Sequence, residues 1–282
     1  MIANTRHLLK EIYANTALHH EVHEIIQKQS TNPEDIREEA LEGLNLISAS
    51  KILDLGCAFG FFTRALGNRI DPDSMITGID HTKAYRHDFL ESCHSIGVKG
   101  YFYGTGVEKV YALPDDAFDL VLSSYSIYFF PDILPEIRRI LKPEGHFVII
   151  SHATNHAGEC IRFIMETFQE MEIVQPSFFP YQELVSRFND NNGKQILSRW
   201  FDEVVMKEHR SALLFRPEDF QSLKRYFQFK KPYYIPGDSK NSQRIANKAL
   251  ERLKALLDQG KSFRVTKDDV IFVCTKPRKN VR

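Results

Sequence analysis

The stretch KILDLGCAFG, residues 51–60, is the part of this chain that decides its fold. Its first five residues are mostly apolar and predict a short buried strand. Two glycines then mark a turn, and the residues after Gly60 predict a helix. Glycine lets the backbone approach a ligand more closely than a Cβ allows, and the helix N-terminus behind it offers unpaired N–H groups. The stretch therefore predicts a strand, a ligand-binding turn and a helix in succession.

The pattern continues on the C-terminal side of this stretch. Residues 75–80 predict a second strand that ends in Asp80, where an acid can accept hydrogen bonds from both hydroxyls of a ribose. Further strands are expected at residues 100–103, 118–123 and 146–151, with helices at 60–68, 83–95 and 132–141 between them. Strands that alternate with helices predict a parallel sheet covered on both faces.

The flanking segments have a different rhythm. Helices are expected at residues 5–28, 33–48, 157–172 and 180–190, and strands at 201–207 and 269–274. An insertion separates those two strands, with a helix from residue 216, a loop at 232–237, and a long helix along the Ile245–Leu257 stripe. We expect an α/β fold with a Rossmann-like, mostly parallel seven-stranded sheet, helices on both faces and a helical cap. The expected domains are an N-terminal helical lid (1–48), the core (49–207 and 266–278) and a helical cap insertion (208–265).

Composition narrows the class of protein. Lys plus Arg and Asp plus Glu are 37 each, so the net charge is zero, which argues against a dedicated nucleic-acid binder. The chain shows neither a signal-peptide core nor an apolar run long enough to span a membrane, so we expect a cytoplasmic protein. Its four cysteines are far apart, which argues against a disulfide framework or zinc site. His19 and His23 have the spacing of a helical metal pair, but no third ligand is apparent, so no metal is predicted.

Four motifs stand in order in this sequence: KILDLGCAFGFFT (51–63), TGID (77–80), LPDDAFDLVLSSYSIYFFPD (113–132) and LKPEGHFVII (141–150). Together they resemble the class I S-adenosylmethionine-dependent methyltransferases over about 100 residues. The resemblance implies S-adenosylmethionine as cofactor and S-adenosylhomocysteine as product. A dinucleotide cofactor is disfavoured, because no third glycine continues the G-x-G-x-x-G pattern. Decarboxylated S-adenosylmethionine, as aminopropyltransferases use, remains an alternative on the same fold.

The resemblance also implies cofactor-binding residues. It places Asp54 and Gly56 at the methionine end, Asp80 at the ribose, and residues 106–108 over the adenine, with residues 123–124 beneath the methionine moiety. The full expected set is Asp54, Gly56, Ala58, Gly60, Asp80, His81, Val107, Glu108, Ser123 and Ser124. Two positions depart from the family pattern. Ala58 replaces the usual middle glycine, a methyl group that costs little if φ is negative there, and Gly106 replaces an Asp, which suggests backbone-only recognition of adenine.

The outer layout is similar to small-molecule methyltransferases of the histamine N-methyltransferase type, although the acid that holds the amine there has no counterpart here. Candidate substrate contacts are Tyr13, His19, Tyr125, Tyr128 and His152, and the last three are the candidate catalytic residues. No strong base constellation is visible, which favours an amine or carboxylate on a small molecule as the acceptor. A protein methyltransferase and a non-catalytic binding protein on a methyltransferase scaffold remain alternatives, and the oligomeric state is open.

Overall fold

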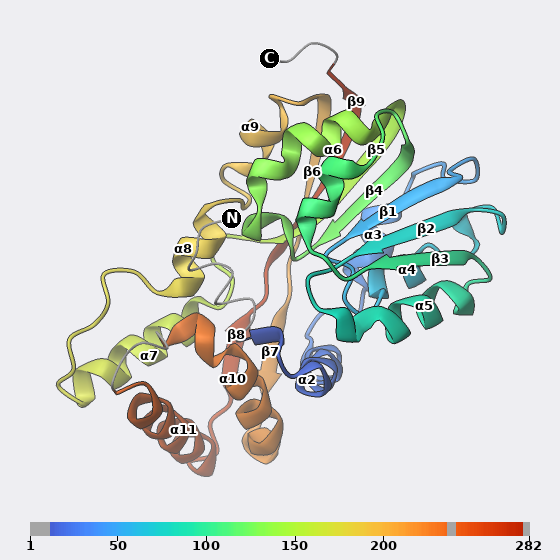
Figure 1. The fold of residues 1–282 in the computed structure, drawn as a ribbon. Helices are drawn as coiled ribbons and strands as arrows, with labels where there is room; N and C mark the ends of the chain where they lie inside the picture. Colours follow the sequence, from blue (N-terminus) through green and yellow to red (C-terminus); the bar gives the residue numbers. More distant parts are fainter. Residues whose placement is uncertain (1–11, 236–240, 279–282) are drawn as a thin grey trace. The chain divides into compact units, whose positions relative to one another are not determined.

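The computed structural model describes residues 12–235 and 241–278. The chain forms two compact units, each built from three segments (Figure 1). The sheet unit consists of Glu34–His152, Arg187–His209 and Asp269–Arg282, and the helical unit of Met1–Pro33, Ala153–Ser186 and Arg210–Asp268. Among the described residues, no helix is both long and apolar enough to span a membrane.

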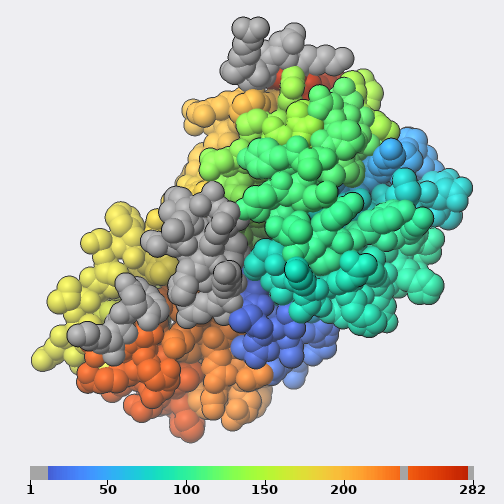
Figure 2. Space-filling model, in the orientation of Figure 1, coloured from blue at the N-terminus to red at the C-terminus, as the bar shows by residue number. Residues whose placement is uncertain are grey.

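The sheet unit contains a seven-stranded, mostly parallel sheet, which confirms the expected fold class. Its strands are β1 (Lys51–Leu55), β2 (Met75–Ile79), β3 (Lys99–Tyr103), β4 (Phe118–Ser124), β5 (Leu141–His152), β6 (Phe201–His209) and β9 (Asp269–Pro277). They lie in the order β3-β2-β1-β4-β5-β9-β6. The first five are parallel, whereas β9 runs antiparallel to both β5 and β6. β3 is an edge strand of the sheet, and the segment that contains α5 and β3, drawn in teal, forms part of the surface in Figure 2.

Helices cover both faces of this sheet. On one face, α3 (Ile36–Leu41), α4 (Phe61–Ala65) and α5 (Arg86–Ser95) contribute to one buried apolar cluster together with side chains of β1, β2, β4 and β5. On the other face lie α6 (Leu134–Ile140) and α9 (Gly193–Leu197) (Figure 1). A Cβ on Gly193 would lie 2.5 Å from the ring of Phe272, so α9 begins in close contact with β9. Short 3₁₀ segments join these elements: η1 (Gly67–Arg69), η2 (Lys83–Tyr85), η3 (Val107–Ala112), η4 (Ile127–Phe129) and η5 (Pro131–Ile133).

The helical unit combines helices with a small sheet. Its elements are α2 (Thr16–Gln29), α7 (Gly158–Glu170), α8 (Pro180–Ser186), η6 (Pro217–Asp219), α10 (Phe220–Tyr234) and α11 (Ser242–Asp258), with the antiparallel strands β7 (Ala212–Phe215) and β8 (Phe263–Thr266). An ion pair joins α2 to α10, in which Arg225 Nε donates to Glu21 Oε1 over 2.8 Å. Another contact joins α7 to β8, where Thr266 N–H donates to Glu159 Oε2 over 2.9 Å. The 208–265 insertion is therefore not wholly helical.

Several element bounds differ from those expected. The first described long helix begins at Thr16, because the Asn15 side chain caps it by accepting from Leu18 N–H; part of the expected 5–28 helix lies outside the described residues. The helix expected over 33–48 is only Ile36–Leu41 and ends before Gly43, whose φ is +75°. In contrast, α10 continues through Pro232 to Tyr234 where a loop was expected, because both residues are buried on its packed face.

The two compact units also divide the chain differently from the expected domains. The α3 helix, expected in the N-terminal lid, belongs to the sheet unit because Ile36, Ala40 and Leu41 are part of its core cluster. The α7 and α8 helices, expected in the core, belong to the helical unit. The function of the helical unit as lid and cap stays a prediction.

Candidate active site

The turn after β1 requires glycine for reasons internal to the protein. Gly56 has φ +75°, and its N–H donates to the Ile79 carbonyl over 2.8 Å. A Cβ on Gly56 would lie only 2.5 Å from the Cβ of Ser126, which follows β4. Gly60 also has φ +75° and begins α4, and a Cβ there would lie 2.8 Å from that of Ser92. The turn is thus closely packed between the ends of β1, β2 and β4.

Ala58 corrects one expectation. Its φ is +41°, in the left-handed region, and not negative as a low cost of the methyl group would require. The backbone at Ala58 is therefore strained, because the Cβ disfavours this conformation. The strained backbone nevertheless forms a specific contact, because Ala58 N–H donates to Oδ2 of Asp80 over 3.1 Å. The turn after β1 is therefore fastened directly to the acid after β2.

Asp80 lies at the junction of three loops. It is 6% exposed, and its Oδ1 accepts from Thr82 N–H over 2.8 Å. The His81 Nδ1 atom is 3.3 Å from the same oxygen. The Asp80 carbonyl accepts from Gly106 N–H over 2.9 Å, which connects the loop after β3. A carboxylate has about four acceptor positions, so further hydroxyl groups can still bind to Asp80.

The segment after β3 presents mainly backbone at this junction. Gly106 is buried with φ +83°, and it begins η3, whose first residues are the half-buried Val107 and the exposed Glu108. A Cβ on Gly106 would lie 2.8 Å from Glu108 Oε2. This conformation fits recognition of a base by backbone groups at Gly106, while the contact of Val107 and Glu108 with adenine stays a prediction.

Asp54 is a buried acid within β1. It accepts a hydrogen bond of 2.8 Å from Thr63 Oγ1 on α4. Burial raises the pKa of Asp54 to about 7, an effect that the hydrogen bonds from Thr63 partly oppose and the charge of Asp80 reinforces. Near neutral pH, Asp54 is therefore poised between its protonated and ionised forms.

Two serines of β4 have different environments. Ser123 is fully buried, and its Oγ lies 2.7 Å from Ser126 Oγ, which in turn donates to the Leu55 carbonyl over 2.8 Å. Ser124 is half-buried at the end of the strand. Ser123 is thus linked to β1 through Ser126, and contact of Ser123 or Ser124 with the cofactor stays a prediction.

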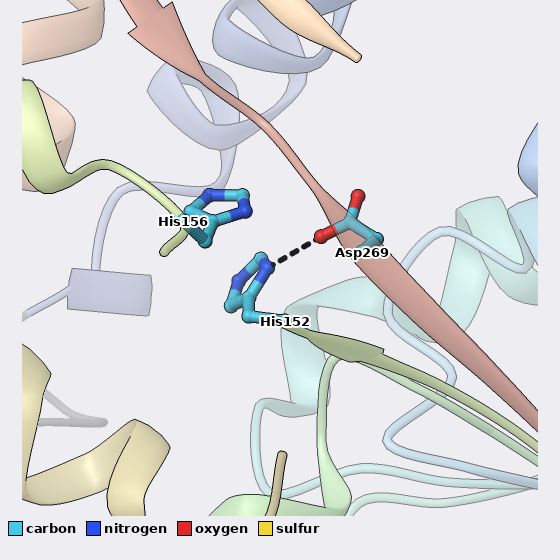
Figure 3. Close-up of side chains that lie close together, drawn as sticks. All are labelled: His152, His156 and Asp269. Carbon is cyan, nitrogen blue, oxygen red and sulfur yellow. Dashed lines mark hydrogen bonds and ion pairs between the residues drawn. The ribbon is translucent and has the colours of Figure 1, made fainter. Parts of the chain in front are cut away.

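The structure brings the three catalytic candidates together around a residue that the sequence analysis missed. Asp269, the first residue of β9, accepts from Tyr125 Oη over 2.7 Å. Figure 3 shows its other contact, in which a carboxylate oxygen lies 2.8 Å from His152 Nδ1. The side chain of Asp269 is fully buried and that of His152 is 9% exposed. The His152 ring lies 4.8 Å from the Tyr125 ring and is stacked on the Tyr128 ring at 5.6 Å. The available signal was an acid at the start of the apolar run DVIFVC.

The other two substrate candidates lie together in the helical unit. The His19 ring is stacked on Phe229 at 5.0 Å, and Tyr13 Oη is 3.3 Å from Tyr233 Oη. Burial, followed by the charge of Lys230, lowers the pKa of His19 to about 3, so its imidazole is neutral at ordinary pH. The five candidates therefore form two groups, one in each unit, and a common substrate pocket stays a prediction.

Comparison with known proteins identifies the sheet unit. The methyltransferase domain family matches residues 53–149, which run from β1 into β5. The chain carries a class I methyltransferase domain. The cofactor of this class is S-adenosylmethionine, as expected from the four motifs. The acid Asp80, held beside the turn after β1, fits this group, because its carboxylate can accept hydrogen bonds from ribose hydroxyls.

Similar proteins include curated relatives and solved structures. An uncharacterized methyltransferase of Schizosaccharomyces pombe is 21% identical over 182 residues, which cover 59% of this chain and 67% of that protein. The 2-methyl-6-phytyl-1,4-hydroquinone methyltransferase 2 of Oryza sativa is 27% identical over 179 residues, which cover 61% of this chain but only 48% of that protein. Phosphoethanolamine N-methyltransferase 2 of Haemonchus contortus, solved with S-adenosyl-L-methionine, has a TM-score of 0.53 at 15% identity and covers 98% of this chain and 61% of that one. At this identity the structural likeness shows the fold.

Proposed function

We propose that this chain transfers a methyl group from S-adenosylmethionine to an amine or carboxylate of a small molecule. The observation that carries the proposal is the position of Asp80, whose carboxylate is held beside the turn after β1 by the N–H groups of Ala58 and Thr82. This arrangement places an acceptor for ribose hydroxyls beside the turn between β1 and α4, where nucleotide ligands of such folds bind.

Each part of the site has a proposed task. Asp80 accepts from the ribose, residues 106–108 contact the adenine, and Asp54, Gly56 and residues 123–124 contact the methionine portion. Bound S-adenosylmethionine supplies a methyl group on a positively charged sulfur, ready for in-line displacement. The protein then has to align the acceptor and exclude water, and alignment can contribute about 7–11 kcal/mol.

The small-molecule acceptor is supported by two observations. Relatives named for small-molecule methylation, the rice hydroquinone methyltransferase among them, match about 60% of this chain. The equal numbers of acidic and basic residues give no excess of cations with which to bind RNA. We also propose that the helical unit selects the acceptor, that the protein is cytoplasmic, and that nucleic acid is not a partner.

Two measurements test this function against its alternatives. Calorimetry with S-adenosylhomocysteine should show saturable binding, whereas a non-catalytic scaffold that has lost the site should show none. Transfer of tritiated methyl groups is then measured separately to a deproteinised yeast extract and to the protein fraction of the same extract. Label in the small molecules supports the proposal. Label confined to protein identifies a protein methyltransferase and contradicts it.

A further inference from the structure

The Tyr125–Asp269–His152 group fixes one protonation pattern. Both oxygens of the buried Asp269 carboxylate have partners, with Tyr125 Oη donating to Oδ2 and His152 Nδ1 adjacent to Oδ1. A carboxylate that accepts from Tyr125 requires Nδ1 of His152 to be the donor to its other oxygen. The proton on the neutral imidazole is then at Nδ1, and Nε2 carries the lone pair. An acid that orients a histidine in this tautomer gives a competent proton acceptor.

The group lies at the carboxyl ends of the parallel strands, where ligands of open α/β folds bind. Tyr125 directly follows β4, and His152 is the last residue of the parallel strand β5. His152 is paired with Asp269 in the antiparallel β5–β9 ladder, which fixes the two side chains next to each other. The next residue after Tyr125 is Ser126, which contacts the position of Gly56 in the turn after β1. The imidazole and the proposed cofactor loop therefore both lie at the carboxyl ends of the parallel strands.

The charges around this imidazole favour a cationic ligand. Asp269 contributes a buried negative charge, and the Tyr125 and Tyr128 rings flank His152. On β6, His209 is in register with Asp269 but is bonded to Glu39 of α3, which also pairs with Lys207. A carboxylate beside aromatic rings attracts ammonium groups.

We propose that His152 is the general base of the methyl transfer proposed above, on which this inference rests, and that the acceptor is an ammonium group. Nε2 of His152 takes a proton from the ammonium, which frees the nitrogen lone pair. That lone pair forms the new N–C bond to the methyl carbon, while the C–S bond breaks and its electron pair stays on sulfur as a neutral thioether. The proton on His152 later returns to water. Asp269 and Tyr125 are positioning residues that hold the imidazole in its Nδ1–H tautomer. A carboxylate acceptor has no proton to lose at neutral pH and does not need this group.

The first test needs no acceptor. Long-range ¹H–¹⁵N spectra of the ¹⁵N-histidine-labelled protein at pH 8, assigned with His152→Asn, should show a neutral His152 with its proton on Nδ1. In Asp269→Asn this preference should be lost. A proton on Nε2 of wild-type His152 overturns the proposal, whether or not an acceptor is known.

The second test uses the labelled yeast extract, with products separated by cation and anion exchange. The labelled product should be an amine. The pH–rate profile of the wild type should have one ascending limb, along which the rate increases as His152 loses its proton. His152→Asn should lower the rate about 10²–10⁴-fold and move that limb up to the pH at which the ammonium group itself loses its proton. Asp269→Asn should move the limb to lower pH, because the imidazolium loses the carboxylate that stabilises it. Tyr125→Phe removes a donor to that carboxylate and keeps the aromatic ring, so it should move the limb to higher pH.

Two matched variants complete the design. His87→Asn changes an imidazole on α5 whose side chain is 87% exposed, and it should leave the rate and the profile unchanged. His156→Asn tests the other histidine drawn in Figure 3, and the limb should stay at the wild-type pH in this variant. A limb that stays at the wild-type pH in His152→Asn, or a labelled carboxylate ester, overturns the proposal. Absence of any transfer by the wild type, despite S-adenosylhomocysteine binding, instead contradicts the proposed function.

Discussion

The N–H of Ala58 donates to the carboxylate of Asp80 over 3.1 Å while Ala58 itself is in the left-handed region at φ +41°. The contact joins the turn after β1 to the end of β2. It shows that Asp80 organises the protein backbone in addition to its proposed contact with ribose.

Replacing Asp80 should weaken cofactor binding. Asp80→Ala removes a charged acceptor from two ribose hydroxyls, and each such hydrogen bond contributes about 1.5–3 kcal/mol. We expect the dissociation constant of S-adenosylhomocysteine, measured by calorimetry, to increase by at least about tenfold. Asp73→Ala, in the exposed turn before β2, is the control and should bind as the wild type does. Unchanged affinity in Asp80→Ala means that the ribose binds elsewhere.

The turn at Gly56 can be compared with another glycine of the same φ. Gly43 and Gly56 both have φ +75°, but a Cβ on Gly43 meets nothing within 4 Å. Gly43→Ala should therefore lose only about 1–2 kcal/mol of unfolding free energy to backbone strain. Gly56→Ala should lose a further 1–3 kcal/mol or so, because its Cβ collides with Ser126. Urea denaturation measures both losses of unfolding free energy. Adding Ser126→Gly to Gly56→Ala should recover part of the loss that the collision causes. Equal losses at the two glycines would falsify the packing argument.

Ala58→Gly should increase stability. The substitution relieves about 1–2 kcal/mol of left-handed strain and costs about 0.4–1 kcal/mol through the freer unfolded chain. We expect a small net gain in unfolding free energy, with S-adenosylhomocysteine affinity retained. Ala65→Gly within α4 is the matched control and should lose about 0.5–1 kcal/mol. Similar losses in both variants would show that Ala58 is not strained.

The buried Asp54 should make stability fall as pH increases. Its pKa is about 7 in the folded state against 3.8 for the ordinary group, so the folded protein binds the extra proton between these values. Unfolding free energy then decreases by up to about 1.4 kcal/mol per pH unit from pH 4 to 7. In Asp54→Asn this decrease should disappear. The unfolding free energy of the variant should therefore rise relative to that of the wild type up to about pH 7, and the difference should be constant above that pH. Urea denaturation at pH 5, 6, 7 and 8 without cofactor checks this, and a constant difference contradicts it.

His19 should have the opposite effect, at acid pH. Its pKa of about 3 lies below the ordinary 6.5, so the folded protein binds fewer protons than the unfolded chain between these values. Unfolding free energy then decreases as pH falls below 6.5. His19→Phe keeps an aromatic ring against Phe229 and should recover about 1–2 kcal/mol at pH 5, with little change at pH 8. The exposed neighbour His20→Asn should not reproduce this recovery.

The sequence predicted those parts of the site that depend on local pattern. The strand at 51–55, the turn that follows it and the acid after β2 are all encoded within about 30 residues, and the structure places them as expected. Asp269 could not be found in this way, because its pairing with His152 depends on an antiparallel ladder between segments 117 positions apart. The same reason explains why β7 and β8 were missed, since each is four residues long and the two pair across about 50 positions of the chain.

The position of β9 has a consequence for synthesis of the protein. This strand follows all the others along the chain, yet it lies between β5 and β6. While the nascent chain grows, β5 has no neighbour on that side, and its unpaired N–H and C=O groups can template association with other chains. The ribosome releases N-terminal segments first, so β5 waits for more than 100 residues before its partner emerges. Chaperone capture during translation is therefore expected to concentrate on chains that end between Ser151 and Asp269.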